Sequence, residues 1–96
     1  MSSIVIVYKN GYGKRVRMNN FRTQHKGGGG TSAASGDSEV ADTAFAGNDA
    51  QAIITTAKGK VIVFPLEEIR ELSRSAKGTK LINLKDGDYV KTVMVR

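Results

Sequence analysis

Positive charge is concentrated in the first third of the chain. A basic strip between residues 9 and 26 holds six cations and no acid, namely Lys9, Lys14, Arg15, Arg17, Arg22 and Lys26. Such a strip is typical of proteins that bind nucleic acid, because lysine and arginine displace the counterions of phosphates. The alternative is a solvated cationic face that only aids solubility. Nucleic acid is favoured, since later stretches mix both signs of charge.

A run of four glycines, Gly27 to Gly30, follows the basic strip directly. Glycine adopts positive φ and leaves its N–H groups bare, so such a run can form an anion-binding concavity. Lys26 would add a point charge beside it, and Gln24 could donate to a phosphate oxygen. A flexible linker is the alternative. A nucleotide-binding P-loop is excluded, because no Gly-Lys-Ser/Thr stands at the required spacing.

Residues for catalysis or metal binding are scarce. The chain has no cysteine, and nothing near its single histidine, His25, supplies carboxylates for a metal site. Glu67, Glu68 and Glu71 could suggest paired-carboxylate catalysis, but neighbouring arginines favour solvated ion pairs. No nucleophile with a general base is discernible. We therefore expect no enzyme activity, no catalytic residue, no metal and no cofactor.

Length and composition indicate one small globular domain or a piece of a larger one. The 96 residues are 40% hydrophobic and 25% charged, with a net charge of +6 and a pI near 9.8. No apolar run approaches the roughly 20 residues of a membrane helix, and no secretion signal is visible at the start. These features predict a cytoplasmic protein with no membrane partner, and the nucleic-acid binding expected from the basic strip would associate it with the nucleoid.

Strands must position the charged residues, because the apolar pattern is that of strands nearly throughout. In residues 14–18, Val16 and Met18 face one side and Arg15 and Arg17 the other. Asn10-Gly11 and Asp86-Gly87 mark tight turns, and a second hairpin surrounds Gly59. Only residues 66–72 favour a helical turn. The predicted strands are 3–8, 14–18, 40–46, 52–56, 61–64, 80–84 and 89–95.

The two halves of the chain resemble each other. Gly13-Lys14 opens a strand in the first half, as Gly59-Lys60 does in the second, and a segment ending at Gly30 matches one ending at Gly78. The offset drifts from 46 to 49 residues. A unit of nearly fifty residues with four short strands has the size of a propeller blade. We predict two blade repeats, residues 1–49 and 50–96, which are too few to close a ring.

Two motifs resemble the C-terminal DNA-wrapping domain of the DNA gyrase A protein and of its topoisomerase IV counterpart. Residues 10–15, Asn-Gly-Tyr-Gly-Lys-Arg, are similar to that family's hairpin Gly-Tyr-x-Lys-Arg. Residues 24–30 resemble its box, Gln-Arg-Arg-Gly-Gly-Lys-Gly, with His25 replacing an Arg and Gly29 replacing the Lys. Residues 73–84 are similar to a blade without a box. Phe64-Pro65 and residues 81–84 lean towards topoisomerase IV.

The resemblance implies an all-β fold of β-pinwheel or propeller-type blades, each of four antiparallel strands. Oligomerisation or the remaining blades of a type IIA topoisomerase would complete it. It also implies that a basic rim binds and bends double-stranded DNA through its phosphates, without base readout and, with two box cations absent, without strong wrapping. The expected DNA-binding residues are Lys14, Arg15, Arg17, Arg22, Gln24, Lys26, Gly27, Gly28, Gly29, Gly30, Lys60, Arg74, Lys77 and Lys80.

Two other functions stay open at the level of sequence. Two blades leave open sheet edges, so the chain could be an assembly module that self-associates into a ring and binds little DNA. A small β-barrel for single-stranded RNA or DNA is a weaker alternative. Stacking on single strands needs exposed aromatic side chains, and the chain has only three Tyr and three Phe.

Overall fold

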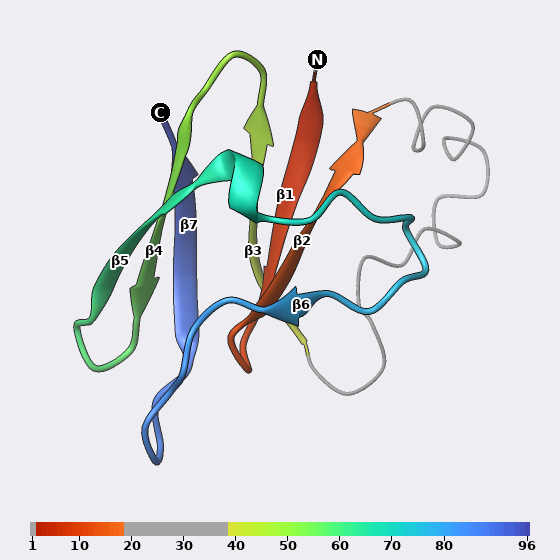
Figure 1. Cartoon of the computed structure of the whole chain (residues 1–96). Coiled ribbons are helices and arrows are strands. Elements are labelled where there is room, and N and C mark those ends of the chain that lie inside the picture. Colours follow the sequence, from red (N-terminus) through yellow and green to blue (C-terminus); the bar gives the residue numbers. More distant parts are fainter. Residues whose placement is uncertain (1, 19–38) are drawn as a thin grey trace.

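Strands make up nearly all the regular structure of the computed structural model, which describes residues 2–18 and 39–96 (Figure 1). The strands predicted at residues 3–8 and 40–46 are confirmed with the same bounds, and the all-β fold is confirmed with them. The strands are β1 Ser3–Tyr8, β2 Tyr12–Arg17, β3 Val40–Ala46, β4 Gln51–Thr56, β5 Val61–Pro65, β6 Thr79–Lys80 and β7 Val90–Val95.

The strands form two antiparallel sheets. The first has the order β3-β1-β2-β6, and the second has the order β5-β4-β7. The second sheet therefore has three strands among the described residues, where a blade of four was predicted. The sheets meet where β3 lies beside β7, and the Asp42 carboxylate accepts the Val93 N–H at 3.0 Å across this junction.

The main core lies between the facing sides of the two sheets. Val5 and Val7 of β1 pack there with Ile54 of β4 and Val93 of β7. The other side of β1 is also buried, in a second cluster with β2. Because both faces of β1 are covered, its side chains read as a continuous apolar run rather than as an alternating one. This rigid strand holds β2, which carries the basic residues, in place.

The two hairpin turns are built alike. The Gly11 N–H donates to the Tyr8 carbonyl at 3.0 Å, and the Gly59 N–H donates to the Thr56 carbonyl at 3.0 Å. Both glycines have positive φ, +91° and +92°, which a side chain would disfavour. Gly11 is thus the counterpart of Gly59, and the hairpins are offset by 48 residues. The predicted pairing of Gly13-Lys14 with Gly59-Lys60 was wrong by two positions.

The segment after β5 crosses to the first sheet and lies along β2. A 3-10 turn, η4 Leu66–Glu68, is all that forms of the helical turn predicted over 66–72. The chain then runs beside β2 without forming a helix. The Arg15 N–H donates to the Arg70 carbonyl, and the Leu72 N–H donates to the Arg15 carbonyl. Next, β6 pairs with Tyr12 and Gly13 of β2.

The strand predicted at 80–84 is short for a tertiary reason. The N–H groups of Leu81 and Ile82 both donate to the single carbonyl of Gly11, at 2.9 and 3.2 Å, so the chain turns away from β2 there. Between its two attachments to β2, the crossing segment leaves a loop at residues 73–78, which we call the tethered loop. Figure 1 shows this loop beyond the edge of the first sheet.

Candidate nucleic-acid interface

The Lys14 ammonium anchors the tethered loop from inside. Lys14 is fully buried, and its Nζ donates to the carbonyl oxygens of Ser73, Arg74 and Ala76 at 3.1, 2.6 and 2.6 Å. Burial lowers the pKa of Lys14 from the ordinary value of lysine. An ammonium has three N–H donors and no acceptor, so three carbonyls satisfy it completely. Lys14 therefore holds the loop against β2.

This arrangement leaves the Lys14 ammonium without an exposed donor for a phosphate. Lys14 pairs with Ile6 across the sheet and lies on the same face of β2 as Val16, which is fully buried. A cation on that face points into the protein, and its donors are occupied by backbone carbonyls.

Arg15 and Arg17 lie on the other face of β2, as their alternation with Val16 predicted. Arg15 is half-buried, and its Nε donates to the Ile69 carbonyl at 2.7 Å. Arg17 is exposed and forms an ion pair with Glu71. The two arginines therefore do not form a free fork, since each already has a partner on the crossing segment.

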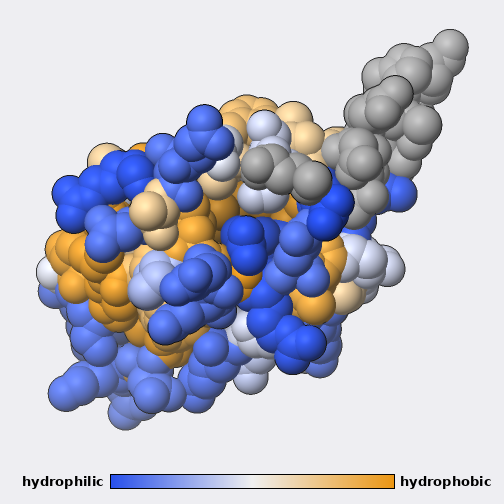
Figure 2. All heavy atoms as spheres, turned by 45° about the horizontal axis from the view of Figure 1, so that its top comes forward, coloured by the Kyte–Doolittle hydropathy of each residue, from blue (hydrophilic) through white to orange (hydrophobic). Residues whose placement is uncertain are grey.

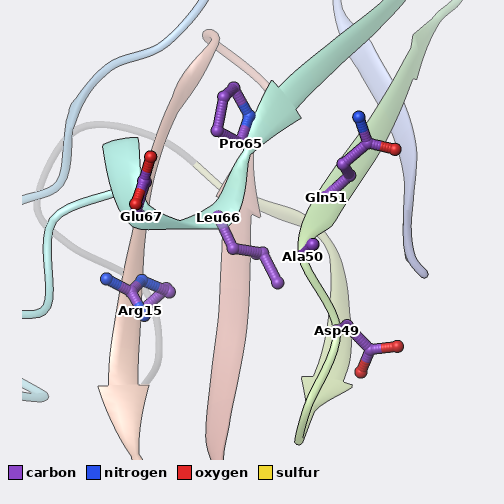
Figure 3. A pocket seen from close by; sticks show the side chains of 7 residues that line it. All are labelled: Arg15, Asp49, Ala50, Gln51, Pro65, Leu66 and Glu67. Carbon is purple, nitrogen blue, oxygen red and sulfur yellow. The ribbon is translucent and has the colours of Figure 1, made fainter.

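A hollow of about 500 Å³ opens beside Arg15 (Figure 3). Leu66 points into this space, and the carboxyl groups of Glu67 and Asp49 stand on its two sides. Carboxylates at the margin oppose an anion, so this hollow is a poor place for a phosphate. Among the described residues, no group of three or more acidic, His or Cys side chains could hold a metal ion.

The remaining predicted cations of the second half fall into two places. Arg74 and Lys77 lie on the tethered loop, and Lys80 lies on β6, the edge strand of the first sheet, so these three follow one another along this edge. Lys60 lies apart from them, at the β4–β5 turn, where its Nζ is 3.4 Å from the Asn83 carbonyl. The other predicted residues, Arg22, Gln24, Lys26, Gly27, Gly28, Gly29 and Gly30, lie outside the described residues.

Two glycines that were not singled out as functional shape this edge. A Cβ placed on Gly78 would lie 2.5 Å from the Gly13 carbonyl oxygen, and a Cβ on Gly13 would lie 2.5 Å from Leu81 Cδ1. Only a residue without a side chain allows the loop to come this close to β2. The repeat comparison matched Gly78 with another glycine but gave no sign of this contact.

In the second sheet, hydrogen bonds to Asp88 connect the β4–β5 turn with the start of β7. The Asp88 carboxylate accepts the N–H groups of Lys58 and Tyr89 at 3.0 and 2.9 Å. Burial alone would raise the pKa of Asp88, but hydrogen bonds from Lys58, Thr56 and Tyr89 and the charge of Lys58 outweigh it, so the pKa lies below the usual value. Asp88 thus joins the β4–β5 turn to β7.

The sequence of this chain matches a known protein family over nearly all of the described residues. A family model described as "DNA gyrase C-terminal domain, beta-propeller" matches residues 3–42 and 51–95. The gyrase A protein of Staphylococcus aureus, strains MRSA252 and NCTC 8325, is 33% identical over 97 residues. That match covers 97% of this chain and 11% of the relative, so the chain spans about a tenth of the length of these relatives.

Solved structures share the fold. The structure of a DNA gyrase A C-terminal domain superimposes with a TM-score of 0.83 at 20% identity, over 98% of this chain and 31% of the other. The C-terminal domain of DNA topoisomerase IV superimposes with a TM-score of 0.72 at 17% identity, over 100% of this chain and 30% of the other. No helix in the described ranges is long and apolar enough to cross a membrane. Because its sequence matches the family model and its fold superimposes on a solved C-terminal domain, the chain belongs to the DNA gyrase C-terminal domain, beta-propeller family.

Proposed function

We propose that this chain binds double-stranded DNA through its phosphates, without reading base sequence, as a non-catalytic module. The observation that carries the proposal is the edge formed by the tethered loop and β6. From residue 72 to residue 85 the chain has four cations and no acid. Three of them, Arg74, Lys77 and Lys80, lie on the tethered loop and on β6, the edge strand of the first sheet. Such a group of cations suits a row of phosphates.

The form of the molecule supports backbone contact over base readout. Reading the major groove requires a projecting helix or a two-stranded ribbon. Among the described residues, η4 is the one complete helical element and has three residues, and both hairpins belong to larger sheets, because β1 also pairs with β3 and β4 with β7. Contacts from loops and strand ends to phosphates position DNA without carrying sequence information. Bending of the duplex over successive basic edges would add contacts at a cost in deformation energy.

The wider setting is part of the same proposal. We take residues 1–49 and 50–96 as two blade repeats, because β1, β2 and β3 recur as β4, β5 and β7 in the same pairing. The relatives are gyrase A proteins, of which the chain spans about a tenth. The remaining blades of a gyrase or topoisomerase IV protein of this type are then the expected neighbours, and the nucleoid is the expected location.

Fluorescence anisotropy with a duplex of about 40 base pairs, titrated across a salt series, tests the DNA-binding proposal. Roughly four to eight phosphate contacts would give a slope of log K against log salt of about −4 to −7. The slope should not change when the base sequence is scrambled. Absence of binding at low salt, or loss of binding on scrambling, would contradict the proposal. A single-stranded competitor that displaces the duplex would instead favour the single-strand alternative.

A second candidate function is assembly, and the exposed side of the second sheet favours it. Val61 and Val63 of β5 and Met94 of β7 are exposed at 61%, 47% and 58%. Ile53 of β4 pairs with Val63 on one side and with Met94 on the other. Val63, Ile53 and Met94 therefore form one apolar row across the sheet. Figure 2 shows apolar side chains at the surface on the side where β5 lies in Figure 1. Patches of this kind mark protein interfaces.

Analytical ultracentrifugation over a wide concentration range separates the two functions. A ring built from copies of the chain predicts a mass that rises with concentration, and Val63→Lys with Met94→Lys should return it to the monomer. A monomer mass at every concentration would remove the ring version. Lysine substitution at these positions should leave DNA binding through the tethered loop in place.

A further inference from the structure

We propose that the tethered loop is a phosphate-binding loop whose shape is set by Lys14, a positioning residue that itself touches no DNA. The inference rests on the proposed DNA-binding function and assigns part of it to particular atoms. The ligand is a phosphate of the DNA backbone. The contacting groups are the backbone N–H groups of Arg74 and Ser75 together with the side chains of Arg74 and Lys77.

The directions of the peptide groups carry the argument. The carbonyls of Ser73, Arg74 and Ala76 converge on Lys14 Nζ at 2.6–3.1 Å. In a trans peptide the C=O of one residue and the N–H of the next point in opposite directions. The N–H groups of Arg74 and Ser75 therefore point away from Lys14. Within residues 2–18 and 39–96, neither of these N–H groups has an acceptor.

The loop is also fixed at its two ends before any ligand arrives. At its start, the Leu72 N–H donates to Arg15, and the Ala76 N–H closes a turn on the Ser73 carbonyl at 3.2 Å. At its end, Gly78 lies against the backbone of Gly13. A loop held in one shape loses little conformational entropy on binding. Outward N–H groups beside cationic side chains can then each donate to an oxygen of the DNA backbone.

Lys14 makes this arrangement possible because its ammonium donates to the loop's carbonyls on the side that faces the protein. Without an internal cation, three converging carbonyl dipoles would repel one another and the peptide groups would turn. The charge of Lys14 would reach DNA only through the loop. Loss of Lys14 should therefore cost the phosphate contacts of the whole loop, and more than the loss of one exposed lysine.

Three substitutions that each remove one lysine charge provide the test. Lys14→Met keeps the length of the side chain and removes its donors, Lys77→Met removes a cation from the loop, and Lys91→Met removes an exposed cation from β7 in the other sheet. In the duplex salt series, we expect Lys77→Met to reduce the slope by about 0.9 and Lys14→Met by about 1.8, the loss of two contacts. Lys91→Met should leave the slope unchanged.

Coupling shows whether Lys14 acts through the loop. Arg74→Gln should weaken duplex binding in the wild-type chain and have no further effect in the Lys14→Met chain. Circular dichroism must show that Lys14→Met is folded. An unchanged slope in folded Lys14→Met, or full additivity with Arg74→Gln, would overturn the proposal.

A measurement on the wild-type chain covers the case in which Lys14→Met does not fold. In ¹⁵N–¹H spectra titrated with a duplex of about 12 base pairs, and separately with inorganic phosphate, the amides of Arg74 and Ser75 should shift together and saturate. If anisotropy shows duplex binding while the chemical shifts of these two amides do not change, the loop proposal is overturned and the DNA-binding proposal stands. Absence of duplex binding would remove both proposals.

Discussion

Gly78 lies so close to Gly13 that a Cβ on Gly78 would be 2.5 Å from the Gly13 carbonyl oxygen and 3.0 Å from its nitrogen. The obstacle is backbone, which cannot give way as the end of a flexible side chain can. This contact fixes how near the tethered loop comes to β2. The end of the cationic loop is therefore placed by two residues that carry no side chain.

Gly78→Ala should destabilise the protein, because the new methyl group forces the loop away from β2. Overpacking of this kind costs about 1–3 kcal/mol in the free energy of unfolding. Urea denaturation gives this value directly. Gly47→Ala is the matched control, since a Cβ on Gly47 meets nothing within 4 Å and this glycine has no positive φ. Equal stability of the two variants would show that the Gly78 contact is not tight.

Lys14→Met should destabilise the protein more strongly than removal of a surface lysine. It leaves the carbonyls of Arg74 and Ala76 facing an apolar side chain, whereas the Ser73 carbonyl keeps the Ala76 N–H. Unsatisfied buried polar groups cost about 1–3 kcal/mol each, so a total of about 2 kcal/mol or more is expected. Lys91→Met, on the exposed side of β7, should change the free energy of unfolding by less than about 0.5 kcal/mol. Thermal and urea unfolding of both variants would measure the difference.

The alternation of residues 14–18 already contained the information that Lys14 is buried. Lys14 stands two residues before Val16, so both point to the same side of the strand, and that side was assigned to apolar residues. Reading Lys14 as a surface cation followed the charge count and ignored this period of two. The three carbonyls that satisfy its charge lie 59–62 residues further along the chain. No local pattern could have predicted them.

Other parts of the fold were predictable in proportion to how local their causes are. The strand at 3–8 follows from a β-branched run that ends at a tight turn, and this strand and the weaker candidate at 40–46 were both placed correctly. The helical turn after Pro65 and the strand after Thr79 were predicted too long, because hydrogen bonds to β2 and to the Gly11 carbonyl decide where those elements end. The two-residue error in the repeat offset arose from matching Gly-Lys pairs rather than glycines of positive φ.

Acid should weaken the fold through Asp88. Hydrogen bonds hold the folded pKa of Asp88 below its ordinary value, 3.8. The stabilisation is therefore fully present above that ordinary value, which applies to the unfolded chain, and is lost as the pH falls through the folded pKa. Urea midpoints measured between pH 6 and pH 2 should fall less steeply below about pH 4 in Asp88→Asn than in the wild-type chain.

Asp86→Asn provides the control for this pH dependence. It changes a carboxylate in the same turn and leaves both N–H contacts of Asp88 intact. Its midpoints should show the same acid-induced fall as the wild-type chain. If Asp88→Asn retained the full fall as well, other carboxylates would have to account for it.

Glu71 should act as an internal competitor for DNA, because it forms an ion pair with Arg17 on the surface of the first sheet. Arg17 is half-exposed, so a phosphate could take the place of the carboxylate. The pair itself contributes little to stability, about 0.2–1 kcal/mol. Glu71→Gln should therefore tighten duplex binding and steepen the salt slope by about 0.9, the equivalent of one additional phosphate contact.

Glu68→Gln is the comparison that gives this last prediction its force. Glu68 is an exposed residue on η4, and no ion pair with a lysine or arginine of the described chain is found for it. Both substitutions remove one negative charge, so a general effect of net charge would strengthen binding equally. A larger gain for Glu71→Gln, abolished when Arg17→Gln is added, would place Arg17 in contact with phosphate. Equal gains in the two variants would show that Arg17 does not contact phosphate when DNA binds.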